Sequence, residues 1–482
     1  MNISLKTLIL SGVSSCAKNR STYVNRHLLA TTTLCAIIIG GSANSALPSL
    51  GNSGANDGEL AQLGHEAMIS ASRRNPTLED VELHAYLSSL LNTLRSANGL
   101  DEYNIQLTMF ADRSVNAFAL PGGYIGVFAG LILSASSESA LVSVLAHELS
   151  HLSQRHIHRF MERQSQASLA AMAALVAAAV VMRDNPDAAQ ATIYSGLATA
   201  NQSLLDYSRA HEREADRTGQ RFMSVAGFRP EGMAEMFEGL AVKEQLNQGQ
   251  GLEYLQTHPV TQSRIADAWE SARQFNKTGS DDKLAFALLQ ARVATLVGAP
   301  VTNEARPYAL ALAALRRGEP KTARRELAEL PSELASHRTA MLLQARIDAA
   351  LGKLDTALAQ VQELHIDFPD WYPAIHYHAE LLDDAGQSQQ AADVLQHYLR
   401  DNESSWPLSY QTLSIYYRQA GDNMNALRWN AEYYLADRNY VAAAGLFEQA
   451  MQHAPENSAV AVRIQSRLDL TQQRALQERP SK

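Results

Sequence analysis

The sequence predicts a mainly α-helical protein: an α+β domain with a small sheet and a metal site, followed by an all-α solenoid. Two observations predict this. His147, Glu148 and His151 form an H-E-x-x-H pattern inside an apolar run with helical spacing. In the last third of the chain, glycines recur every 34 residues. Because 482 residues exceed one ordinary core, two or three domains are expected.

The composition is that of a folded, globular protein, with 46% hydrophobic and 19% charged residues. The formal net charge of -9 argues against a nucleic-acid partner. The two cysteines, Cys16 and Cys35, both lie near the N-terminus. If that segment is removed, histidines and carboxylates must hold any metal ion.

Residues 1–46 are expected to be a signal peptide. Basic residues from Lys18 to Arg26 precede an apolar core, Leu28 to Ile39, and then small residues up to Ala46. Export of a cysteine-free mature chain fits the periplasm of a Gram-negative bacterium. An uncleaved membrane anchor is the alternative.

Residues 59–94 show two helical patterns interrupted near Pro76, and residues 103–110 alternate like a strand. A turn at Pro121-Gly122-Gly123 leads into a second predicted strand, residues 124–128.

We expect that second strand to be an exposed edge that holds an extended substrate, with Asn116, Gly122, Gly123 and Tyr124 as its residues. Glycines beside such a strand would let another backbone approach closely. The alternative is a plain hairpin that closes a small sheet.

The H-E-x-x-H run predicts a helix that begins near Ser136 to Glu138. Residues four apart lie on one face, so His147 and His151 can bind the same metal ion. Glu148 is then close enough to act as general base on a water, as in metalloproteases. The alternative is two unrelated histidines with this spacing by coincidence.

A catalytic zinc needs a third protein ligand. Glu212 is the candidate, and Asp216, one helical turn later, could orient a ligand imidazole. The alternative is a solvated, charged helix. His156 and His158 are out of register for the metzincin pattern and are expected at the surface.

Three motifs carry a family resemblance: N-A-F-A-L-P-G-G from Asn116, H-E-L-S-H from His147, and E-x-E-A-D-x-x-G from Glu212. They resemble the gluzincin metallopeptidases that include the HtpX heat-shock protease and the CAAX prenyl protease. The resemblance covers about residues 60–264 and implies a zincin-like metalloprotease domain. It also implies one Zn²⁺ per chain, with Glu212 as the third ligand.

Residues Thr257 to Arg264 form T-H-P-x-x-x-x-R, which resembles a motif of the periplasmic members. The resemblance implies that His258 lies near the zinc, either assisting catalysis or capping the metal. Arg264 can only donate hydrogen bonds, to an oxyanion or a substrate. The alternative for both residues is a loop that caps a helix.

Residues 167–182 carry no charge but are too short for a confident membrane span. We expect a buried helix or one that lies on a membrane surface.

The last third predicts tetratricopeptide repeats. Gly318, Gly352, Gly386 and Gly421 are spaced by 34 or 35 residues, and an alanine follows each by five positions. Residues 440–455 look like a further half-repeat. The expected domains are a protease domain at 47–275, a linker or transition helix at 276–303, and repeats at 304–482.

The resemblance as a whole implies a periplasmic zinc endopeptidase that acts in quality control of outer-membrane proteins. Its substrates would be unfolded or misassembled outer-membrane proteins, and its repeats would bind the β-barrel assembly machinery. Two alternatives stay open: a chaperone or assembly factor with a capped or structural metal site, and a repeat scaffold with a vestigial protease domain.

Overall fold

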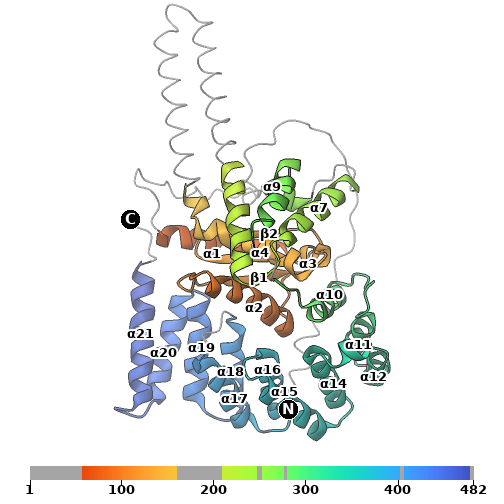
Figure 1. The fold of residues 1–482 in the computed structure, drawn as a ribbon. Coiled ribbons are helices and arrows are strands. Elements are labelled where there is room, and N and C mark those ends of the chain that lie inside the picture. Colours follow the sequence, from red (N-terminus) through yellow and green to blue (C-terminus); the bar gives the residue numbers. More distant parts are fainter. Residues whose placement is uncertain (1–56, 160–208, 247–251, 276–278, 402–405, 478–482) are drawn as a thin grey trace, which may run out of the picture. The chain divides into compact units, whose positions relative to one another are not determined.

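The computed structural model describes residues 57–159, 209–246, 252–275, 279–401 and 406–477 (Figure 1). The expected signal peptide and the uncharged stretch 167–182 lie outside these residues. Within them, no helix combines the length and the hydropathy that crossing a membrane requires.

The first part of the chain is α+β, as predicted. Its elements are α1 (Asp57–Arg74), α2 (Val81–Ala97), β1 (Gln106–Phe110), β2 (Ala117–Leu120), β3 (Tyr124–Phe128), α3 (Ala129–Ser134), α4 (Glu138–Ser153), a helical segment at 209–225, α7 (Glu231–Leu246), α8 (Glu253–Thr257), α9 (Gln262–Ala272) and α10 (Lys283–Val297). The break between α1 and α2 falls at Pro76, because proline lacks the N–H that a helix interior needs.

The three-stranded sheet has the order β1-β3-β2, and this corrects the expected edge strand. The strand that begins at Tyr124 is central: it pairs in parallel with β1 and antiparallel with β2, and all five of its residues are buried. The two edge strands are β1 and β2, and the sequence did not predict β2 as a strand. Gly122 and Gly123 form the turn between β2 and β3, both at a φ near +85° that side chains disfavour.

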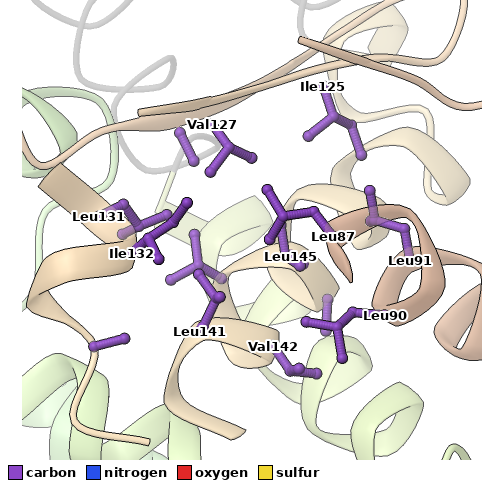
Figure 2. Packing of buried hydrophobic residues seen from close by; sticks show 14 of the residues in the cluster. Leu87, Leu90, Leu91, Ile125, Val127, Leu131, Ile132, Leu141, Val142 and Leu145 are labelled. Carbon is purple, nitrogen blue, oxygen red and sulfur yellow. The ribbon is translucent and has the colours of Figure 1, made fainter. Parts of the chain in front are cut away.

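Helix α4 is held against one face of this sheet. Figure 2 shows Ile125 and Val127 of β3 pointing toward Leu145 of α4, with Leu87 of α2 beside it. Each such side chain contributes roughly 1.5–3 kcal/mol when fully buried. Ser137 caps the start of α4 by accepting a hydrogen bond from the N–H of Ala140 at 3.1 Å, as the sequence suggested.

The second part consists of helix pairs. Its elements are α11 (Arg306–Arg316), α12 (Pro320–Ala328), α13 (Ser332–Ala335), α14 (Arg338–Ala350), α15 (Leu354–Asp367), α16 (Tyr372–Asp384), α17 (Ser388–Asp401), α18 (Leu408–Gln419), α19 (Asn423–Ala436), α20 (Tyr440–His453) and α21 (Ala459–Gln477).

The repeat prediction is confirmed at its marker residues. The four glycines lie between the two helices of successive pairs, with φ between 75° and 82°, where a left-handed residue ends the first helix. The four alanines that follow them are at most 4% exposed. The expected half-repeat at 440–455 is α20, and α21 completes it as a further pair.

Candidate metal centre

Three segments that are distant in the sequence bring the predicted ligands together. Helix α4 carries His147, Glu148 and His151, the helical segment 209–225 carries Glu212, and His258 follows the last residue of α8. Gly219 permits the close contact between the first two. A Cβ at this position would lie 3.3 Å from backbone atoms of Ala146 and His147, tighter than most real contacts.

Four residues offer potential ligand atoms at the spacing of a tetrahedral metal site. Nε2 of His147 is 3.0 Å from Nε2 of His151, 3.2 Å from Nδ1 of His258 and 3.5 Å from Oε2 of Glu212. Oε1 of Glu212 is 3.4 Å from Nε2 of His151 and 3.0 Å from Nδ1 of His258. Bonds of 2.0–2.1 Å to a tetrahedral zinc would separate its ligand atoms by roughly 3.3 Å. These residues therefore fit a zinc ion.

Asp216 supports this set from behind, as predicted for a residue that orients a ligand. Its Oδ1 lies 3.0 Å from Nδ1 of His147, which leaves Nε2 of the same ring facing the other ligands. A carboxylate that holds the outer nitrogen of a ligand imidazole is the usual arrangement at protein zinc sites.

The guanidinium of Arg264 contacts the carboxylates of Asp216 and Glu212. It donates from Nε and Nη2 to both oxygens of Asp216 at 2.7 Å, and Nη1 lies 3.1 Å from Oε2 of Glu212. A third donation reaches the carbonyl of Pro259 at 2.8 Å. The guanidinium is buried, and its N–H groups are directed at these carboxylates and at Pro259. This favours a role in holding the two carboxylates, rather than the predicted contact with substrate.

The local electrostatics keep the carboxylates charged. Burial alone would raise the pKa of Glu212, but the charge of His258 and hydrogen bonds from three imidazoles lower it well below its ordinary value. Burial lowers the pKa of His151 to about 3, despite the opposing effect of a hydrogen bond from its ring to Glu212. His151 is therefore neutral at physiological pH, the form with a lone pair for a metal ion.

Glu148 is placed for proton transfer. It is 1% exposed, and its Oε1 lies 3.6 Å from Nε2 of His258. Oε1 accepts no hydrogen bond from any residue that the structure describes. It is therefore available to accept a proton from a bound water.

The predicted edge-strand residues do not gather at this centre. Asn116 precedes β2, and the two glycines form the turn. The hydroxyl of Tyr124 lies 3.1 Å from Nδ1 of His65 on α1.

Sequence reasoning missed two neighbours of the ligands. Tyr254 of α8 stacks on His258 with ring centroids 4.9 Å apart; it stands four residues earlier on the same helical turn, a spacing that could have signalled the contact. His156 was expected at the surface, which is wrong: it is 2% exposed and lies against His151. The tight turn at Arg155, with φ of 54°, brings it back toward the ligand.

Comparison with known proteins agrees with this geometry. Residues 78–272 match the model of Peptidase family M48. The chain is 27% identical over 484 residues to the beta-barrel assembly-enhancing protease of Escherichia coli, with 94% of this chain and 97% of that one covered. A Vibrio cholerae protein described as "Putative beta-barrel assembly-enhancing protease" is 36% identical over 229 residues, about half the length of either chain. The mitochondrial metalloendopeptidase OMA1 of Schizosaccharomyces pombe is 30% identical over 227 residues, 46% of this chain and 63% of that one. An M48 domain implies a metal cofactor.

Proposed function

We propose that this chain, whose residues 78–272 match the model of Peptidase family M48, is a zinc-dependent endopeptidase. His147, His151 and Glu212 hold the metal ion, and Glu148 is the general base. The observation that carries the proposal is the near-tetrahedral spacing of the ligand atoms beside a buried carboxylate that has an oxygen available. Imidazole and carboxylate ligands suit zinc among the divalent ions.

When bound, zinc polarises the scissile carbonyl and makes water more acidic. Glu148 accepts the proton of the attacking water and later delivers it to the leaving amine. The Asp216 carboxylate faces Nδ1 of His147 at 3.0 Å, so this ring stays oriented throughout. Arg264 holds the charge of Asp216 and Glu212 in a buried site.

His258 would cap the metal ion in a resting state. Its Nδ1 lies where a fourth ligand would be, whereas a catalytic zinc keeps this position open for water and substrate. The ring must therefore move aside before cleavage. Once displaced, it can donate a hydrogen bond to the oxyanion instead.

Strand β2 binds the substrate in extended form. It is one of the two edge strands beside β3, and it contacts α4, which carries the ligands. An added strand would be held by main-chain hydrogen bonds and would place its scissile bond near the metal centre.

The substrates are unfolded or misassembled outer-membrane β-barrel proteins, and the place of action is the bacterial periplasm. The likeness over 94% of the chain to a beta-barrel assembly-enhancing protease supports this. The helix pairs from α11 onward would bind the assembly machinery, since stacked repeats present an extended concave surface. The proposal also includes the expected N-terminal signal peptide.

A second candidate is an assembly factor whose metal site is structural. The observation in its favour is the position of His258, because structural zinc sites have four protein ligands. In this case the repeats carry the main role, and cleavage is dispensable.

Metal content and hydrolysis of an unfolded protein such as casein test both candidates. We expect Glu148→Gln to keep one zinc per chain and to lose activity by about 10²- to 10⁴-fold. Full activity in this variant would refute the mechanism.

His258→Ala should keep zinc and cleave faster than wild type if the ring is a cap. Loss of cleavage would instead make His258 a catalytic donor. Normal outer-membrane assembly in cells with Glu148→Gln would favour the assembly factor.

A further inference from the structure

A second histidine lies directly behind one of the metal ligands. His156 is 2% exposed, and its Nδ1 lies 2.9 Å from Nδ1 of His151. The other nitrogen of His151, Nε2, faces His147 and Glu212 in the metal centre. The His151 ring therefore stands between the centre and His156.

The positions of the ring protons determine which of the two Nδ1 atoms donates in this hydrogen bond. A neutral imidazole that binds a metal through Nε2 carries its proton on Nδ1. His151 must then donate through Nδ1, so Nδ1 of His156 must be the acceptor. His156 consequently carries its own proton on Nε2.

That proton has a partner. Nε2 of His156 lies 3.3 Å from Oε2 of Glu214, on the same helical segment as Glu212. Arg159 fixes this carboxylate by donating from Nη2 to Oε2 at 2.9 Å. The ring of His211 stacks on His156 with centroids 4.3 Å apart and planes 11° apart, which fixes the ring plane.

The two histidines of α4 thus have matching support. Behind His147 stand Asp216 and Arg264, and behind His151 stand His156, Glu214 and Arg159. We propose that His156 is a positioning residue for the metal ligand His151: it accepts the Nδ1 proton and so fixes the tautomer and ring orientation that leave Nε2 for the metal. The proposal rests on the metal centre described under Proposed function.

The same side chains could also be regarded as a second cation site, because ligand atoms of His156, His211 and Glu214 lie within 4.8 Å of one another. The hydrogen-bond chain argues against this. If His156 accepts from His151 through Nδ1, its Nε2 is protonated and has no lone pair for a metal. A metal ion bound to His151 therefore makes a second metal ion at His156 unfavourable.

A matched pair of variants tests the proposal. His156→Asn places an amide oxygen close to the position of Nδ1 and keeps an acceptor, whereas His156→Leu has a similar shape and no acceptor. We expect the zinc dissociation constant, measured by competition with a chelator, to rise about 10- to 100-fold in His156→Leu and to stay close to wild type in His156→Asn. His158→Leu, in the same helical turn, is the control and should leave zinc affinity unchanged. Thermal unfolding of the metal-free proteins is measured in parallel, since a purely structural defect would lower that Tm.

The outcomes separate this proposal from the metal centre itself. Equal zinc affinity in wild type and His156→Leu would overturn the positioning role and leave the centre intact. An equal loss of zinc affinity in both His156 variants, together with a lower Tm of the metal-free proteins, would also overturn the positioning role. Two zinc ions per wild-type chain, with one lost in His211→Ala, would make the cluster a cation site instead. No zinc in the wild type would refute the centre, and the positioning role with it.

Discussion

At the scale of single residues, the metal centre places several charges out of contact with water. Glu212, Asp216 and Arg264 are each 7% exposed or less. Burial alone would raise the pKa of Asp216, but hydrogen bonds from His147 and Arg264 lower it below its ordinary value. The folded pKa of Asp216 is therefore below its unfolded value of about 3.9.

We predict that Arg264→Gln lowers the free energy of unfolding of the metal-free protein by roughly 3–5 kcal/mol at pH 7, because it removes the guanidinium that pairs with two buried carboxylates. The contribution of the ion pair is complete above about pH 4 and is lost as pH falls through the folded pKa of Asp216. The difference in the free energy of unfolding between variant and wild type should therefore become smaller below about pH 4. Urea unfolding as a function of pH measures this. Arg217→Gln changes an exposed arginine on the same helical segment as Asp216 and should shift stability by less than about 0.5 kcal/mol. Equal effects of the two substitutions would contradict the prediction.

At the scale of elements, β2 is an edge strand of the sheet; the other edge strand, β1, is bridged by Thr77 at Phe110. The N–H of Phe128 donates to the carbonyl of Asn116, so these two residues form a hydrogen-bonded pair. Such pairs alternate in an antiparallel ladder, which makes Ala117 and Ala119 the residues whose main-chain groups point away from β3. These groups are where an extended substrate would bind.

We predict that Ala119→Pro strongly reduces cleavage of an unfolded protein and keeps the zinc, because it removes an outward N–H and no bond to β3. Hydrolysis rate, zinc content and thermal unfolding should be measured together. Ala119→Val retains the N–H and is the matched control, with cleavage expected near wild type. If the proline variant cleaves as fast as the valine variant, β2 is not the substrate strand.

At the scale of the whole molecule, α10 connects the two kinds of fold. Its side chains Phe286, Leu289 and Val293 pack into the core of the first part, while Leu288 and Ala291 pack with the first repeat helices. Between these faces, Arg292 is buried and forms ion pairs with Asp80 and Glu82 at 2.7 Å. The segment expected to be a linker or transition helix is a helix that belongs to both cores.

We predict that Arg292→Gln lowers the unfolding temperature of the protease part and of the first repeats together, since it removes the nearest cation from two buried carboxylates at a cost of roughly 3–5 kcal/mol. Scanning calorimetry combined with hydrogen exchange resolves the two regions. Arg316→Gln, at the exposed end of α11, is the control and should have little effect. If only one of the two regions lost protection against hydrogen exchange, α10 would not couple the protease part to the first repeats.

The sequence alone determined the features that depend on local periodicity. The spacing of His147 and His151, the strand Tyr124–Phe128, and the turn glycines of the repeats all follow from helix, strand and turn geometry over a few residues. Tertiary structure decided which strand is the edge, because strand order depends on pairing between segments that the local pattern does not encode. It also buried His156 behind His151 and brought Arg264 onto Asp216. The first contact depends on the local turn at Arg155, and the second joins segments 48 residues apart in the sequence, which only the packing of the helices around α4 brings together.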